Sequence, residues 1–467
     1  MLTVFLHEIQ AQMKSMRFQV SLLVLLSFFV ANGVIYSLKI DRDVAETSRI
    51  DSELADQIGE LAVLGDAVGT WYRLTARSTG TEFITEGGFN WFADAYWVNL
   101  QSGNKATEYG RSRTTNHWIR RFEIVDWTLI VRIVLSFLCV VMAYDMISGS
   151  HEQGVLRLTM ANPLSRGAYL AGRFLAQLVM LMIAAVLGAA VSLLILVITD
   201  VIRLDASMAR AIVLFFIGSS FYVAAFLLLS AGVSAWTRNS ATSLVVLMLT
   251  WAVLTVVVPQ TAYLYGMQTV DFDFDWNDEQ WALRNETENA LQQDGISLRE
   301  LDRGIVDNFA LERRFVREMA DVEDQQQRIG AAALARELQQ YEAARAINLV
   351  SPGYAFQYSV EALLGTGVAR RQDFFRQAMQ HREAMRQFVR GRDAQDPESP
   401  HVTFLGDYMS KKAFDSALMP HFRQTPLSMS DSVAAGLVPI VILILEVALA
   451  FFFAFTAFLR MELAGGS

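Results

Sequence analysis

Residues 127–147 read WTLIVRIVLSFLCVVMAYDMI, and residues 148–166 after them read SGSHEQGVLRLTMANPLSR. The first stretch is apolar except at a few positions, and it is long enough for a helix that crosses a bilayer, which needs about 20 apolar residues. The second stretch is polar, contains two glycines and ends at Asn162-Pro163, a pair that stops a helix. This alternation of a membrane crossing and a short structured loop predicts the fold.

Five further apolar runs of similar length occur along the 467 residues. With the first, the runs cover residues 18–38, 127–147, 175–198, 211–233, 243–263 and 433–459. The chain is 53% hydrophobic and 19% charged, which fits a protein that lies partly in lipid and partly in water. We therefore expect an all-α membrane protein with six transmembrane helices and two large, mainly helical extracytoplasmic insertions.

The short segments between and beside the runs decide the expected orientation. Those that flank the termini, join runs two and three, and join runs four and five carry Lys14, Arg17, Arg157, Arg166, Arg173, Arg238 and Arg460. Basic residues in short loops favour the cytoplasmic side. Both termini are therefore predicted to be cytoplasmic, and the two long insertions extracytoplasmic.

Five parts follow from this topology. They are residues 1–38, an interfacial helix with the first span; 39–126, the first insertion; 127–263, spans two to five; 264–431, a second insertion expected to be a helical domain; and 432–467, the last span and the cytoplasmic C-terminus. Residues 276–347 are rich in Glu, Gln, Arg, Ala and Leu and lack proline, which favours long helices and a helical hairpin.

Several functional classes find no support in the sequence. A net charge of −9 argues against a nucleic-acid partner. The chain has one cysteine, no phosphate-binding Gly-x-x-x-x-Gly-Lys-Ser/Thr motif and no His-Glu-x-x-His motif. His401 and His421, with Met409 and Met419, offer soft metal ligands, but surface and packing roles are the favoured interpretation. We expect no catalytic residue, no metal and no cofactor bound by this chain.

The tract from Ser148 to Arg166 is the most informative segment. Ser148-Gly149 permits a sharp turn after the second span, and residues 151–160 then suit a short helix. Its apolar side would consist of Val155, Leu156 and Leu158. Such a helix, projecting from the membrane, either transmits motion between a soluble protein and the bilayer or is a plain turn between spans.

This tract resembles the permeases of the ABC-2 family of transporters, in particular relatives of the permease for nitrous-oxide-reductase maturation and of those linked to gliding motility. The family pattern has an acidic residue at the mouth of span two, then a tract like Asp-x-Ile-Ser-Gly-Glu-x-Glu-x-Gly-Thr-Leu-Arg-Leu, then Asn-Pro-x-x-Arg. The matching positions are Asp126, Trp127, Asp145, Ile147, Ser148, Gly149, Glu152, Gly154, Leu156, Arg157, Leu158, Asn162, Pro163 and Arg166. Ser150 and Val155 depart from it.

The resemblance implies a permease subunit in the bacterial cytoplasmic (inner) membrane that couples ATP hydrolysis to export or to extracytoplasmic work. A coupling helix near 148–162 would sit in a cleft of a separate cytoplasmic ATPase, which binds the ATP and magnesium. The implied coupling residues are Ser148, Gly149, Glu152, Gly154, Leu156, Arg157, Asn162, Pro163 and Arg166. A second permease copy, identical or a paralogue, would complete the assembly within the lipid.

Two charged residues lie inside apolar runs. Arg132 is near the start of the second run and Glu446 near the middle of the sixth. Because a charge inside a bilayer is costly, such residues face protein or water and often serve function. Arg132 can instead extend toward the membrane surface, and Glu446 can pair with Arg132 or form a structural polar contact.

Two other functions compete with transport. A mechanotransmitter would use ATP hydrolysis inside to act on an extracytoplasmic partner protein through the 264–431 insertion. A membrane scaffold or sensor would have no ATPase at all. The substrate cannot be identified from the sequence.

Overall fold

The computed structural model describes residues 1–87, 95–100, 125–161, 163–269, 276–294, 309–399, 401 and 406–461. Within them, six helical stretches are long and apolar enough to cross a bilayer, which confirms the prediction of an all-α membrane fold. These stretches, called spans one to six, are Met16–Gly59, Trp127–Glu152, Arg166–Ile198, Ala206–Thr237, Ser240–Gly266 and Met429–Arg460. Each predicted apolar run lies inside one of them.

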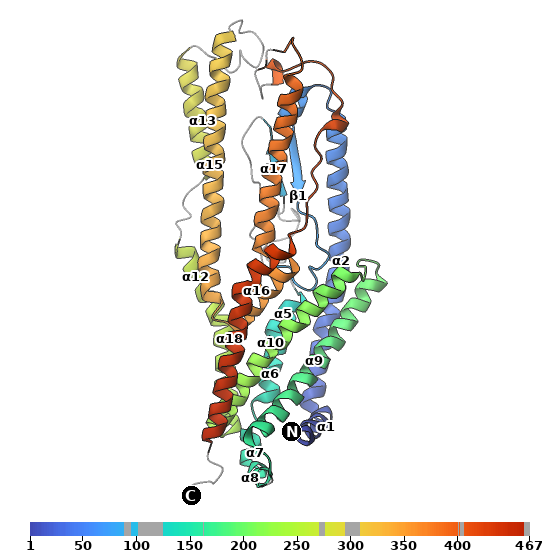
Figure 1. Ribbon diagram of the computed structural model, residues 1–467, viewed down its shortest axis with the longest axis vertical. Helices are drawn as coiled ribbons and strands as arrows, with labels where there is room; N and C mark the ends of the chain where they lie inside the picture. Colours follow the sequence, from blue (N-terminus) through green and yellow to red (C-terminus); the bar gives the residue numbers. More distant parts are fainter. Residues whose placement is uncertain are drawn as a thin grey trace.

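The spans are built from the following elements. Span one is α2 (Met16–Gly59); span two begins with α5 (Trp127–Leu129), η1 (Ile130–Leu135) and α6 (Ser136–Ala143); span three is α9 (Arg166–Ile198); span four is α10 (Ala206–Thr237); span five comprises α11 (Ser240–Ala252), η2 (Val253–Val257) and the start of α12 (Val258–Thr269); and span six is α18 (Met429–Arg460). They form a bundle, and Figure 1 shows both chain termini at its same end. We call this the termini end.

Three short helices lie at the termini end. They are α1 (Leu2–Met13), α7 (Ser148–Glu152) and α8 (Val155–Met160). Helix α1 packs on α9, with Val4 against Gly172. The predicted N-terminal helix is therefore present, and the described structure fixes it to span three.

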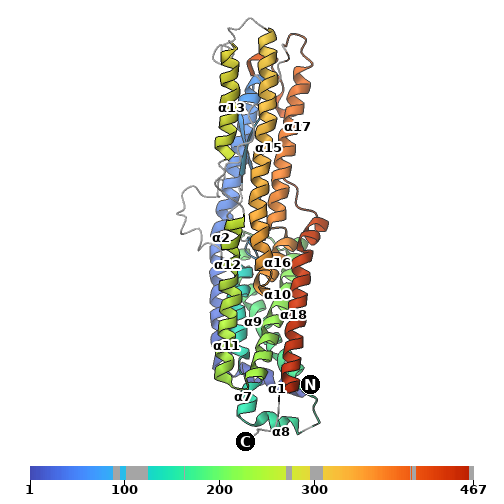
Figure 2. The same ribbon diagram turned by 90° about the vertical axis from the view of Figure 1, so that its left-hand side faces the viewer.

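A lobe extends from the other end of the bundle. It contains the second half of α2 and the elements α3 (Leu64–Gly69), β1 (Trp71–Thr75), β2 (Ala95–Asn99), α13 (Trp276–Gln293), α15 (Phe309–Asn348), α17 (Val368–Asp393), η3 (Gly406–Tyr408) and η4 (Ser416–Leu418). Figures 1 and 2 show α13, α15 and α17 running along the long axis of the molecule. The lobe has its own core, in which Leu74, Val98 and Phe374 are buried.

Helices α13 and α15 form the hairpin that the composition of residues 276–347 predicts. They are fastened by reciprocal hydrogen bonds, in which Gln280 donates to the backbone oxygen of Gln326 at 2.7 Å and Gln326 to that of Gln280 at 3.0 Å. The described parts of the insertions are mainly helical, as predicted, and they add one small two-stranded sheet that the sequence analysis did not predict. Strand β1 pairs antiparallel with β2, Trp71 opposite Asn99, and the alternation of buried residues along it was too short to separate from helix by periodicity.

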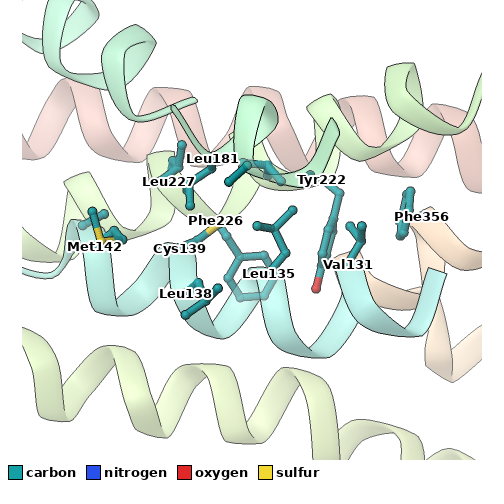
Figure 3. Packing of buried hydrophobic residues seen from close by; sticks show 14 of the residues in the cluster. Val131, Leu135, Leu138, Cys139, Met142, Leu181, Tyr222, Phe226, Leu227 and Phe356 are labelled. Carbon is teal, nitrogen blue, oxygen red and sulfur yellow. The ribbon is translucent and has the colours of Figure 1, made fainter. Parts of the chain in front are cut away.

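Helix α16 (Pro352–Leu364) lies where the lobe meets the bundle, and it packs against α10 and α18. Gly436 of α18 leaves the room for this approach, since a Cβ there would lie only 3.2 Å from that of Ala362 in α16. Phe356 stacks on Tyr222 of α10 with ring centroids 5.1 Å apart. Figure 3 shows that these rings border the bundle core, where span two faces α10.

A buried polar cluster fastens the first three spans together. The Asn32 amide donates to the backbone oxygens of Phe83 at 3.1 Å and Val125 at 2.6 Å. Its oxygen accepts from Trp127 Nε1 at 3.0 Å and from Ser192 Oγ at 2.6 Å. All four hydrogen-bonding positions of a fully buried amide are thus used, which is the condition for stability in an apolar interior.

Replacing Asn32 tests this cluster. Asn32→Leu leaves the Val125 carbonyl without its donor, whereas the Phe83 carbonyl keeps the Trp127 N–H at 3.0 Å. An unsatisfied polar group in the interior costs about 1–3 kcal/mol. We expect a clear fall in the thermal midpoint of the detergent-solubilised protein, measured by tryptophan fluorescence. Ser27→Ala is the matched control, because its exposed hydroxyl bonds only the Leu23 oxygen of the same helix. Equal midpoints for both variants would contradict the role given to Asn32.

Candidate functional site

The segment after α6, from Ser148 to Met160, contains two short helices rather than one. Helix α7 ends at Glu152, and α8 begins at Val155. Between them Gly154 has a φ of 71°, in the left-handed region that glycine adopts without strain. The single helix predicted over residues 151–160 is therefore wrong, and the reason is this turn.

Helix α7 is fastened to spans four and five through serines. The backbone nitrogens of Ile147 and Ser148 both donate to Ser234 Oγ at 3.0 Å. The Ser148 hydroxyl lies 3.0 Å from that of Ser234 and 3.2 Å from that of Ser240. Ser148 is fully buried, so the first turn of α7 moves with the ends of α10 and α11.

Glu152 faces the bundle. Its carboxylate accepts from the backbone nitrogen of Ser240 at 2.9 Å and from the Ser240 hydroxyl at 2.8 Å. This places a negative charge at the first turn of α11, where unpaired N–H groups and the helix dipole favour an anion. Glu152 thus connects α7 to span five.

Two arginines connect the same segment to the rest of the termini end. Arg173 of α9 forms a two-pronged ion pair with Glu8 of α1, with both distances 3.1 Å, and donates to Ser150 Oγ at 2.6 Å. Arg17 of α2 pairs with Asp145 at 2.7 Å. The helices α1, α2 and α9 are therefore all held to the region around α7.

The outer surface of α8 has the opposite character. Leu156 is 1% exposed and holds α8 to the bundle, whereas Val155 is 46% and Leu158 73% exposed. Arg157 is exposed as well. An arginine between exposed apolar side chains is typical of protein interfaces, which are enriched in arginine and apolar residues at their centres.

The remaining predicted coupling residues take varied positions. Gly149 lies against the Asp145 side chain, Pro163 is exposed, and Asn162 falls outside the described residues. Arg166 donates to the backbone oxygens of Phe458, Leu459 and Met461, at 3.1, 2.6 and 3.1 Å. It therefore caps the last turn of α18, where carbonyls lack helical donors.

Arg132 and Glu446 lie apart in the spans. The Arg132 guanidinium is 4.4 Å from the centre of the Tyr354 ring of α16. One carboxylate oxygen of Glu446 is buried without a hydrogen-bond partner in the described structure. Among the residues the structure describes, no ion pair joins the two, so the pairing considered for them is not formed here.

Spans two and five each contain a segment of wider π-helix, η1 and η2. Trp251, just before η2, donates to Ser136, just after η1, at 2.9 Å. The Tyr222 hydroxyl donates to the backbone oxygen of Arg132 within η1 at 2.7 Å. Because π-turns in helices occur frequently at functional sites, this is the part of the bundle most suited to change shape.

The described residues contain no group of histidine, cysteine, aspartate and glutamate side chains suited to hold a metal ion. Met409 and Met419 are buried in the core of the lobe. His401 lies 3.1 Å from the Asp393 carboxylate, which also accepts from Ser399 and Ser410. These contacts fit the packing roles favoured by the sequence.

Sequence reasoning missed the serines that hold α7. Ser234 lies in an apolar stretch of sequence and Ser240 in a polar one, and neither stretch contains a motif. The residues that they contact are distant in the chain. The position of Ser240 directly after Asn239, at a helix start, is the available signal. It marks a helix N-terminus but does not identify Glu152 as the group that reaches it.

Removing the Glu152 carboxylate should loosen the start of span five. In Glu152→Ala the backbone nitrogen of Ser240 loses its acceptor, so amide hydrogen exchange at residues 240–242 should become faster while the rest of α11 stays protected. Mass spectrometry of the exchanged protein measures this. Gln153→Ala serves as control on the neighbouring exposed position. Unchanged exchange in Glu152→Ala would contradict the contact.

The family described as "ABC-2 family transporter protein" matches residues 2–463, nearly the whole chain. No curated protein matches the chain. The family match agrees with the six spans and with the resemblance in the tract after span two, while the finer relation to nitrous-oxide-reductase and gliding-motility permeases stays a prediction. The chain is a multi-pass membrane protein, and it belongs to the ABC-2 family of transporter proteins.

Proposed function

We propose that this permease couples ATP hydrolysis by a separate ATPase to movement of its spans, and that α7 and α8 are where the ATPase docks. The observation that carries the proposal is the two-sided character of this segment. Its inner side is fastened to the three helices α9, α10 and α11 through Ser148, Glu152 and Arg173. Its outer side exposes Val155, Arg157 and Leu158.

A docking element needs both properties. An exposed patch with an arginine and apolar side chains gives a partner something to bind. Packed elements move as rigid bodies. The inner contacts would therefore transmit a displacement of α8 to the spans instead of confining it to the loop. The termini end is then cytoplasmic, in keeping with the basic residues of its short loops, and the membrane is the bacterial inner membrane.

The movement would reach spans three to five first. Glu152 and Ser148 connect α7 to the beginning of α11, and Arg173 connects it to α9. The π-segments η1 and η2 lie farther along spans two and five and would absorb the change. A second permease copy, identical or paralogous, would complete the assembly, and ATP with magnesium would bind on the ATPase.

A mechanotransmitter is the second candidate, and one observation favours it. Helix α2 is continuous for 44 residues from the termini end into the lobe, a length of about 65 Å at 1.5 Å per residue. A continuous helix of this length would transmit a displacement of span one to the lobe, where an extracytoplasmic partner protein could respond. A substrate pathway through the membrane does not require a continuous helix that reaches into the lobe.

The docking proposal is tested by paired substitutions. Arg157→Glu with Leu158→Asp should lower recovery of the ATPase at least tenfold when the permease is purified from its native host and the co-eluting proteins are identified by mass spectrometry. A tenfold loss corresponds to about 1.4 kcal/mol. The matched control is Arg203→Glu with Leu204→Asp, the same two residue types, both exposed, in the loop at the other end of the bundle.

The control should retain the ATPase. Loss of the ATPase in the control, with retention in the α8 variant, would place the docking site at the lobe end and overturn the assigned orientation. Retention in both would remove α8 as the docking element. If no ATPase co-purifies with the wild-type protein from intact membranes, the scaffold or sensor function is favoured.

The transmitter is tested by breaking α2 between bundle and lobe. Val44→Pro, at an exposed position of α2, removes one helical hydrogen bond and kinks the helix. If the lobe responds to ATP through α2, nucleotide-dependent changes in hydrogen exchange of β1 and α17 should disappear in Val44→Pro and persist in Val44→Ala. Lobe exchange that never depends on nucleotide would exclude the transmitter.

A further inference from the structure

A pocket with a volume of about 220 Å³ lies where the lobe meets the bundle. It is bounded by the end of α15, by α16, by the start of α17 and by the second turn of α18. Its polar lining includes Tyr341, Glu342, Arg345, Tyr358, Glu361 and Arg370. Two guanidinium groups, two carboxyl groups and two phenol rings therefore line one pocket.

Arg345 has unused capacity for hydrogen bonds. In the described structure its two terminal nitrogens make long hydrogen bonds, 3.5 Å to the Glu342 carboxylate and 3.4 Å to the backbone oxygen of Ala435, and its guanidinium lies 5.4 Å from the centre of the Tyr358 ring. Its Nε is buried and has no hydrogen-bond partner in the described structure. A guanidinium carries five N–H donors and binds phosphate in a two-pronged manner, so this group is set to receive an oxyanion.

Glu361 provides the opposite charge. It is 2% exposed, and the amide of Gln357 donates to one of its oxygens at 2.6 Å. Burial raises the pKa of this carboxyl to about 7. Arg132 and Arg345 act electrostatically on this carboxyl, but no ion pair to Glu361 is present among the described residues. A buried carboxyl without a cation in direct contact is unfavourable when ionised, and a bound ammonium group would supply that contact. The Tyr341 ring, which also lines the pocket, favours an ammonium group too.

The depth of the pocket points to a lipid. Ala435, which lines the pocket, follows the start of α18 at Met429 by about 9 Å along the helix axis. The apolar part of span six begins in the same turns, so the pocket lies at the level of the lipid headgroups. Tyrosines are enriched at this level of a membrane protein.

We propose that this pocket binds the zwitterionic head of a phospholipid, with the phosphate on Arg345 and the ammonium group on Glu361. The chemistry required is a phosphate and a primary amine separated by a short linker, as in phosphoethanolamine. The inference goes beyond the proposed function, because binding needs neither an ATPase nor transport. It would place an ordered lipid at the joint between span six and the lobe.

The experiment is lipid binding to the purified full chain without any ATPase, measured by native mass spectrometry. Three probes are compared: dioctanoyl phosphatidylethanolamine, dioctanoyl phosphatidylglycerol and the water-soluble glycerophosphoethanolamine. Wild-type protein should bind the ethanolamine lipid saturably and more tightly than the glycerol lipid. Arg345→Gln should weaken this binding at least tenfold, whereas Arg328→Gln, an exposed arginine on the same helix, should leave it unchanged.

Glu361→Gln distinguishes the role of the carboxyl group from that of the Arg345 guanidinium. It should abolish the preference for the ethanolamine lipid over the glycerol lipid, while Arg345→Gln weakens both. If Arg345→Gln lowers the thermal midpoint, Ala435→Phe tests the same pocket from α18 by filling it, and it should also prevent binding.

The probes also identify the source of the ligand. Tighter binding of the lipid than of the soluble head supports a membrane ligand, and equal binding supports the same site with a soluble phosphoamine. Absence of saturable binding, or binding unchanged in Arg345→Gln and Ala435→Phe, would overturn the proposal. If wild-type protein binds the glycerol lipid more tightly than the ethanolamine lipid, the role given to Glu361 is wrong.

Discussion

Inside a bilayer every polar group must find its partner within the protein, and the Asn32 amide meets this constraint for the first three spans. It joins α2 to Trp127 at the start of span two, to Ser192 of α9, and to the backbone at Phe83 and Val125. The chain leaves the bundle at this level to form the lobe and returns to begin span two. One side chain therefore joins the backbone on either side of the first insertion to spans one, two and three.

The contacts at the two ends of the bundle differ in kind. At the termini end, Ser148, Glu152 and Arg173 hold α7 to several helices, while the outer side of α8 stays exposed. At the lobe end, α16 packs between α10 and α18 and brings the Tyr354 ring within 4.4 Å of the Arg132 guanidinium. A displacement applied at α8 thus passes through rigid contacts to spans whose π-segments can change shape. This arrangement suits a permease driven from one side.

Much of the fold follows from hydropathy alone, because each span is an unbroken apolar run and the 276–347 segment has a helical composition. The tract from Ser148 to Arg166 predicted the exposed loop. It did not predict the break at Gly154, which depends on a left-handed turn. Nor did it predict that Glu152 points inward, which depends on Ser240, a residue distant in the chain. Strands β1 and β2 and the pocket around Glu361 escaped prediction for the same reason. They are made by residues brought together only by tertiary packing.

The most direct test of the account is site-specific photo-cross-linking from Leu158 in cells of the native host. A photoreactive amino acid at this position should form an adduct with a protein that carries a phosphate-binding Gly-x-x-x-x-Gly-Lys-Ser/Thr motif, identified by mass spectrometry. The same amino acid at Leu187, an exposed position on span three, should give no such adduct. An ATPase adduct at Leu158 alone is the predicted result, and its absence from Leu158 while the permease is intact in the membrane would contradict docking at α8.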